Sequence, residues 1–131
     1  MKRILGIAML AAALVSADCG KDNGPTAGNL LVKLTSPNSG ADSAIVFTIT
    51  GPVALTSVAP GAGLRVFQQP LGGLTTRFAL VGQLTTGATI LTIGVSNTGQ
   101  VSQYTGAISG VAQSSNYQLR ALTGYQLTVT R

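Results

Sequence analysis

The chain lacks several residue types on which enzyme active sites most often depend. Its 131 residues contain no His, no Glu and no Trp, and only one Cys. General acid–base catalysis draws mainly on His, Glu, Asp, Lys, Tyr and Cys, and beyond residue 28 the only carboxylate side chain is that of Asp42. This composition excludes a Ser-His-Asp triad, a Cys-His site and the paired carboxylates of a glycosidase. An enzyme is therefore not expected.

The same shortage removes the usual ligands of metals and cofactors. Zinc sites need several His or Cys side chains, and a specific calcium site needs several carboxylates. Asp42 with nearby carbonyl groups could bind calcium only weakly, and its place in the turn-rich segment 36–42 (SPNSGAD) favours a turn-stabilising role. No P-loop and no dinucleotide-binding glycine motif occurs. We expect no metal and no cofactor.

Charged side chains are also scarce. They make up 8% of the residues, against about 25% in an average soluble domain. The formal net charge is +5, but the basic residues are scattered singly, whereas a nucleic-acid interface predicts a clustered basic face. We therefore expect no nucleic-acid partner. Isolated solubilising charges are the favoured interpretation, and a mild attraction to anionic lipid or polysaccharide is the alternative.

At its N-terminus the chain carries the pattern of an export signal. Lys2 and Arg3 precede an uncharged run of twelve residues, Ile4 to Val15, and small residues follow it. This order is typical of a secretory signal peptide, and the run is shorter than the about 20 apolar residues of a membrane-spanning helix. The alternative is an N-terminal helix of the domain itself, but the run has no polar face to expose to water. Residues 1–18 are therefore predicted to be a signal peptide.

The end of this leader, Ser16-Ala17-Asp18-Cys19, resembles the lipobox of bacterial lipoproteins. The resemblance implies cleavage before Cys19 and lipidation of that residue with several acyl chains, which is enough for stable anchoring. A single exported cysteine has no intramolecular disulfide partner, and lipid attachment would give it a role. The alternative is ordinary secretion, with cleavage before Asp18 after the small residues of 15–17.

Residues 19–28 are expected to form a flexible tether. The stretch GKDNGPTAG is rich in Gly, Asn, Asp and Pro and has almost no apolar side chains. Gly20 follows the cysteine, so the lipoprotein resemblance implies an outer-membrane or cell-surface destination. The expected partner is thus the membrane, reached through acylated Cys19, and a periplasmic or secreted soluble protein is the alternative.

The rest of the chain, residues 29–131, alternates apolar and polar residues between turn-forming segments. Strands are predicted at 29–35, 44–50, 53–59, 64–69, 74–81, 89–95, 101–112 and 125–130. Short strands separated by turns every 8–12 residues or so, about seven to nine in all, indicate a sandwich or a small barrel. The long central loops favour two packed sheets. The expected fold class is therefore all-β: a single antiparallel β-sandwich, preceded by the signal helix and the linker.

The order of the predicted strands resembles the cohesin-like and immunoglobulin-like sandwiches of bacterial exported proteins. The segments that carry this resemblance are LLVKLTSPN, AIVFTITGP, a strand ending in V-x-P-G, and TILTIGV. It covers residues 29–131 and is also similar to short lipoproteins built from one such domain. No residue set that would transfer dockerin binding is present, so the resemblance implies a fold and leaves the function open.

Two functions are compatible with this sequence. The first is a structural or protein-interaction module of the cell envelope, which presents one face or sheet edge to an envelope protein or a neighbouring copy. Strand 74–81 and the terminal strand are the candidate edges. The alternative is a glycan- or ligand-binding module, which requires Tyr104, Tyr117 and Arg120 to share one exposed concave patch. The favoured interpretation of the two tyrosines is that they are core-edge residues whose hydroxyl groups reach water.

Overall fold

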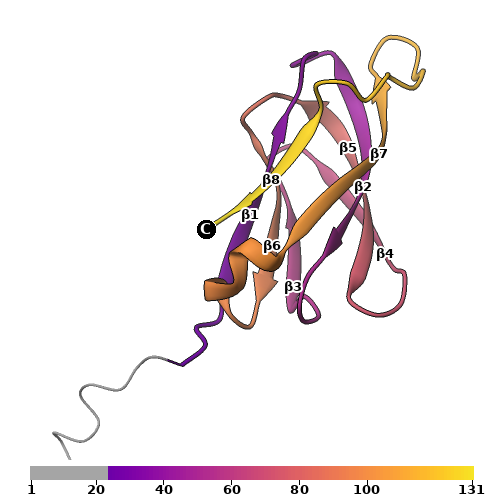
Figure 1. The fold of residues 1–131 in the computed structure, drawn as a ribbon. Coiled ribbons are helices and arrows are strands. Elements are labelled where there is room, and N and C mark those ends of the chain that lie inside the picture. Colours follow the sequence, from indigo (N-terminus) through magenta and orange to yellow (C-terminus); the bar gives the residue numbers. More distant parts are fainter. Residues whose placement is uncertain (1–23) are drawn as a thin grey trace, which may run out of the picture.

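The alternating segments fold into two antiparallel sheets that pack face to face (Figure 1). The computed structural model describes residues 24–131, so the predicted signal peptide, Cys19 and the first part of the predicted tether lie outside the described residues. The described elements are β1 (Gly28–Thr35), β2 (Asp42–Thr50), β3 (Ser57–Pro60), β4 (Arg65–Pro70), β5 (Thr75–Leu84), β6 (Thr89–Val95), the short 3-10 helix η1 (Thr98–Gln103), β7 (Thr105–Gln113) and β8 (Gln126–Thr130). The prediction of an all-β fold is confirmed for this part of the chain.

The strands divide equally between the two sheets. One sheet has the order β3-β6-β1-β8 and the other the order β4-β5-β2-β7. All neighbouring strands are antiparallel. The pairs β1/β8, β2/β7, β3/β6 and β4/β5 are nested, so that the first strand pairs with the last and the fourth with the fifth. The pairs β1/β6 and β2/β5 complete the sheets.

The core lies between the two sheets and consists of the inward-facing residues of the alternating strands. Its fully buried side chains include Leu30, Val32, Leu34, Ile45, Phe47, Ile49, Phe78, Leu80, Leu91 and Ile93. Phe47 and Phe78 lie opposite each other on β2 and β5, with ring centroids 5.6 Å apart, a distance at which aromatic pairs attract. Ile45, Phe47 and Ile49 of the predicted strand 44–50 thus lie in the core, as its alternation of apolar and polar residues requires.

Most predicted strands are present with shifted ends. β6 has the predicted bounds, β5 extends to Leu84, and β3 is shorter than expected because residues 51–56 form a loop after Gly51-Pro52. The segment predicted as one strand over 101–112 is two elements, η1 and β7. Asn97 caps η1: its side chain accepts a hydrogen bond from the Gly99 N–H at 2.9 Å.

The sheet edges agree with the prediction at one strand and differ at another. The terminal strand β8 is an edge, as expected. Segment 74–81 is not an edge, because it belongs to β5, which lies between β4 and β2. Alternation fixes the face that each residue takes but leaves strand pairing open, and this is why the prediction was wrong. The described edges are β3, β4, β7 and β8.

Candidate functional site

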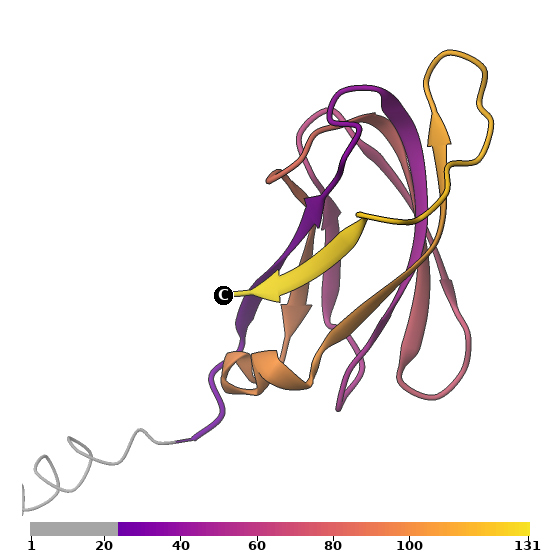
Figure 2. The same cartoon turned by 45° about the horizontal axis from the view of Figure 1, so that its top comes forward.

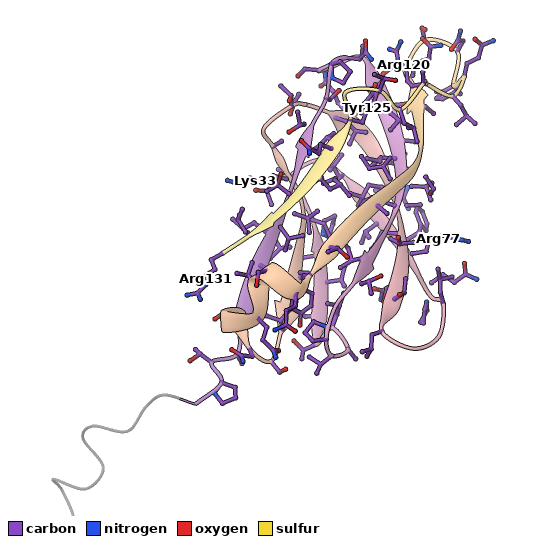
Figure 3. The ribbon with its side chains drawn as sticks, viewed as in Figure 1. Lys33, Arg77, Arg120, Tyr125 and Arg131 are labelled. Carbon is purple, nitrogen blue, oxygen red and sulfur yellow. The ribbon has the colours of Figure 1, made fainter. Side chains whose placement is uncertain are left out.

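Asp42, the first residue of β2, is a buried carboxylate at the end of the sandwich where the β1–β2 corner meets the β7–β8 loop. Arg120 Nε donates a hydrogen bond to Asp42 Oδ1 at 2.8 Å, and the Tyr125 hydroxyl donates to Oδ2 at 2.5 Å. Asn38 Nδ2 in turn donates to the Tyr125 hydroxyl oxygen at 2.8 Å. Arg120 and Tyr125 lie together at this end (Figure 3). We call these four residues the Asp42 cluster.

The position of Asp42 corrects the expectation that its side chain stabilises a turn. A β-bulge between Asp42 and Ala44 shifts the alternation of β2, so that Asp42 faces the interior together with Ile45. The turn itself is stabilised by other residues. The Asn38 N–H donates to Ser36 Oγ at 3.0 Å, and the Ala41 N–H donates to the Asn38 carbonyl at 3.0 Å.

The Asp42 cluster is a brace between two loops. The Asp42 side chain is completely buried and that of Arg120 is 24% exposed, and a buried charge requires a partner of opposite charge and hydrogen bonds to be tolerated. Burial, and next the hydrogen bond to Asp42, raise the pKa of Tyr125 above its ordinary value of 10.0. Because these polar groups bind one another, we assign the cluster the role of fixing the β7–β8 loop.

The three predicted ligand-binding residues do not share one exposed patch. Tyr104 precedes β7 and is only 4% exposed, whereas Tyr117 follows β7, and the nine residues of this strand separate the two by about 25 Å. Burial raises the pKa of Tyr104, whose hydroxyl has no hydrogen-bond partner among residues 24–131. Arg120 lies in the same loop as Tyr117, but it is paired with Asp42.

Tyr117 is the most exposed aromatic residue of the described chain, and its backbone is strained. Its side chain is 75% exposed, and its φ of 57° is the only positive φ of a non-glycine residue within 24–131. The Tyr117 N–H donates to the Gln113 carbonyl at 3.0 Å, which holds this conformation. The loop that carries Tyr117 stands out beyond the end of the sandwich (Figure 2). A strained, exposed aromatic residue is typical of a binding position.

The outer surface of the β4-β5-β2-β7 sheet is apolar near this loop. The strand registers place Ala112, Ala44, Val81 and Arg65 in one row across the sheet, and Gly110, Val46, Ala79 and Phe67 in the next row. With strands about 4.8 Å apart, each row is about 14 Å long. We call the seven uncharged members, namely Ala44, Val46, Phe67, Ala79, Val81, Gly110 and Ala112, the apolar face.

Two large side chains of the apolar face are open to solvent. Phe67 is 56% exposed and Val81 is 45% exposed, although both types of residue are usually placed inside a domain. The Arg65 guanidinium carbon lies 6.0 Å from the centroid of the Phe67 ring, at the outer limit of a cation–π contact. Leu119, 78% exposed, extends this surface from the β7–β8 loop, since a Cβ atom at Gly110 would lie 3.8 Å from Leu119 Cδ2.

A shallow hollow of about 620 Å³ joins the apolar face to the β7–β8 loop. Its lining includes Ala44 of β2, Val81 and Gly82 of β5, and Tyr117 and Ser114 of the loop. The Asp42 cluster fixes the loop that forms one wall, because Arg120 follows Tyr117 by three residues. The surface and the brace are thus parts of one structural unit.

The outer surface of the opposite sheet is mainly polar. Its cross-strand rows contain Lys33 with Thr89 and Thr128, Thr35 with Gln126, and the half-buried Leu31 with Thr92 and Thr130. Figure 3 shows Lys33 and Arg77 projecting from opposite sides of the sandwich. Thr, Lys and Gln are ordinary solvent-facing residues of a half-buried sheet. The two outer sheet surfaces of residues 24–131 therefore differ, because exposed large apolar side chains lie on the apolar face, namely Phe67 and Val81, and none of comparable exposure lies on the opposite sheet.

Comparison of the chain with protein-family models, curated proteins and solved structures gave no match in any of the three. Within residues 24–131, no group of three or more metal-ligating side chains comes together. Nor does that part of the chain hold a helix long and apolar enough to cross a membrane. The two sheet surfaces and the β7–β8 loop therefore carry the features that bear on function.

The sequence predicts Tyr117 as a binding residue and assigns no function to the apolar face. Segment 64–69 (LRVFQQ) is predicted as a strand without an assignment of its faces, and phenylalanine is a residue type usually found in the core. The neighbouring residues indicate the orientation of Phe67. Arg65 lies two positions before it and Gln69 two positions after it, so that all three side chains project from the same face of the strand. A phenylalanine that alternates with charged and polar residues on its own face is an outward-facing phenylalanine.

Proposed function

We propose that this chain is an exported, lipid-anchored module of the cell envelope that binds a partner protein through the apolar face and has no enzymatic activity. The observation that carries this proposal is the contrast between the two outer surfaces: Phe67 and Val81 are exposed on one sheet, while Thr and Lys residues cover the other. Exposed apolar patches bordered by polar residues are typical of interaction sites.

The physical basis is the transfer of exposed apolar side chains out of water. Burying an exposed Phe, Val or Leu contributes up to about 1.5–3 kcal/mol each. Phe67, Val81 and Leu119 are available for this, and Tyr117 adds a rigid aromatic side chain with a hydroxyl group. Such a cluster, surrounded by polar residues, has the composition of an interface core.

The proposed cellular location is based on the N-terminal leader, residues 1–18, and on Cys19. Residues 1–18 would direct export, Cys19 would carry the acyl chains, and the stretch before β1 would separate the sandwich from the membrane surface. The outer membrane or the cell surface is the proposed location. We further propose a sandwich of the cohesin-like or immunoglobulin-like type, a proposal supported by the order of its strand motifs.

In-cell photo-crosslinking tests the binding proposal. Phe67 is replaced by a photo-reactive phenylalanine analogue in the full chain, expressed in the organism that makes it, and the matched control places the same analogue at Lys33 on the polar sheet. The proposal expects a discrete crosslinked protein from position 67 and a several-fold lower yield from position 33. Equal yields from both positions, or none from position 67, would contradict it.

The intact mass of the mature chain extracted from the membrane fraction tests the proposed address. We expect a mass that begins at Cys19 and includes acyl chains. An unmodified mass that begins at Asp18 would instead establish a secreted soluble protein, and the anchoring proposal would be withdrawn while the binding proposal stands.

A further inference from the structure

The exposed charges of the described chain all have the same sign. The charged side chains of residues 24–131 are those of Lys33, Asp42, Arg65, Arg77, Arg120 and Arg131. Asp42 is fully buried and its charge is paired with Arg120. The remaining four are basic, and each belongs to an exposed residue. A partner of this domain therefore meets positive charge and no exposed carboxylate side chain within these residues.

Two of the four exposed basic residues lie on the sheet that carries the apolar face. Arg65 faces outward from β4 two residues before Phe67 and pairs with Val81. Arg77 faces outward from β5 opposite Gln69, two residues before Ala79. The two arginines therefore lie on either side of Phe67, each in the cross-strand row next to that of Phe67.

We infer that the partner of the apolar face is an acidic protein segment, with carboxylates that meet Arg65 and Arg77 and apolar side chains that cover Phe67 and Val81. This inference rests on the proposed function, since it names the chemistry of the partner at the same surface. Arginine is suited to such a role because its planar guanidinium group binds a carboxylate with two parallel hydrogen bonds. Arginine and aromatic residues also dominate the binding energy of protein interfaces.

Charge complementarity argues against a second copy as the occupant. A symmetric contact through the apolar face would bring the Arg65 and Arg77 side chains of two copies together, with no exposed carboxylate from residues 24–131 to balance them. Like charges facing one another in an interface cost several kcal/mol. An acidic partner removes this cost and gains attraction over a range of about 8–10 Å at physiological ionic strength.

The extent of the apolar face favours a protein over a polysaccharide. Two cross-strand rows, each about 14 Å long, contain mainly Ala, Val and Phe side chains, which match apolar side chains of a partner. A sugar ring needs an aromatic platform with polar groups beside it, and Phe67 with Arg65 and Gln69 on the same face of β4 meets this requirement in part. An acidic polysaccharide is therefore one of the outcomes that the experiment must distinguish.

The test measures the binding of the full chain, as the cell processes it, to matched synthetic peptides. Twelve-residue peptides alternate apolar residues with Glu, Gln or Lys, and polygalacturonate serves as the acidic polysaccharide. The variants are Phe67→Ala, the double variant Arg65→Gln with Arg77→Gln, and the control Lys33→Gln on the opposite sheet. We expect the Glu peptides to bind at least about tenfold more tightly than the Gln peptides, which corresponds to about 1.4 kcal/mol.

The variants separate the contributions of charge and apolar contact. The double arginine variant should lose the preference for Glu over Gln and most of the salt dependence, Phe67→Ala should weaken all peptides, and Lys33→Gln should leave binding unchanged. Equal binding of Glu and Gln peptides, no binding of any peptide, or tighter arginine-dependent binding of polygalacturonate would each overturn the inference. If crosslinking from position 67 succeeds while the Glu preference is missing, only the acidic partner is wrong; if that crosslinking also fails, the proposed function is wrong as well.

Discussion

Arg120 Nε lies 2.8 Å from Asp42 Oδ1, and this contact joins residues 78 positions apart in the sequence. The carboxylate belongs to the start of β2 and the guanidinium to the β7–β8 loop, so the ion pair ties the loop that carries Tyr117 to the body of the sandwich. Because Asp42 is the one carboxylate side chain of residues 24–131, the pair also determines that all exposed charges there are basic. One contact thus supports both the shape and the electrostatics of the proposed binding surface.

Replacing Arg120 by Ala should destabilise the domain by about 2–4 kcal/mol, because it leaves the buried Asp42 carboxylate without its countercharge. The free energy of unfolding in urea measures the effect. Arg77→Ala is the matched control: Arg77 is exposed on the sheet surface, and its removal should change stability by no more than about 0.5 kcal/mol. Equal stability of the two variants would show that the ion pair does not hold the loop.

Removal of the hydroxyl group should lower the stability of the domain at Tyr125 but not at Tyr104. Tyr125→Phe deletes the group between Asn38 and Asp42 and should cost about 1.5–3 kcal/mol, as expected for a hydrogen bond to a charged acceptor. Tyr104→Phe deletes a buried hydroxyl that has no partner among the described residues and should be neutral or stabilising by about 1 kcal/mol. Thermal unfolding of both variants makes the comparison, and a loss of stability in Tyr104→Phe as large as that in Tyr125→Phe would contradict the assigned contacts.

Stability should fall at alkaline pH, and Tyr125 should account for part of the fall. Burial and the hydrogen bond to Asp42 raise the pKa of Tyr125 in the folded state above its ordinary value of 10.0. The folded state therefore holds this proton more tightly than the unfolded state, so the contribution is complete below about pH 10 and is lost as the pH rises through the folded-state pKa. The free energy of unfolding between pH 8 and pH 11 or so should decline less steeply in Tyr125→Phe than in the parent chain. The decline that remains in the variant is expected from Tyr104, whose pKa burial also raises.

The left-handed backbone of Tyr117 should make glycine more stable than alanine at this position. A non-glycine residue at a φ of 57° costs about 1–2 kcal/mol that glycine avoids, and glycine loses about 0.5–1 kcal/mol of that advantage to unfolded-state entropy. Tyr117→Gly should therefore unfold at a higher urea concentration than Tyr117→Ala. Both variants should bind the partner more weakly, because both lack the exposed ring. Identical stability of the two variants would contradict the strained conformation.

The sequence was sufficient to predict the fold class, because the period of apolar residues defines strands and their inner faces. Ile45, Phe47 and Ile49 lie inside as alternation requires. The sequence was not sufficient to predict that Asp42 is buried. A single bulged residue in β2 moves the Asp42 side chain from the outer to the inner face of the sheet, and no local sequence pattern indicates this bulge. The pairing of β5 between β4 and β2 was also beyond reach, since pairing depends on contacts distant in the sequence.

The candidate site was predictable only in part, and for related reasons. Tyr104 and Tyr117 are predicted as binding residues because tyrosine rings can serve as platforms for a ligand, and of the two only Tyr117 is exposed. Tyr104 has the same chemistry but lies against Gly51 and is buried, a difference that depends on the packing of the loop after β2. Phe67 lies on the predicted strand 64–69, and its alternation with Arg65 and Gln69, together with its register opposite Ala79, places it on the outer face.

The most direct test of the central claim is hydroxyl-radical footprinting of Phe67, in native membranes and in the purified chain. Val53, 39% exposed in the loop after β2, is the internal reference outside the apolar face. If a partner covers the apolar face, the oxidation rate of Phe67 should fall several-fold in the membranes while that of Val53 stays the same. An unchanged rate at Phe67 would show that the apolar face is open to water in the cell, and it would contradict the proposed function.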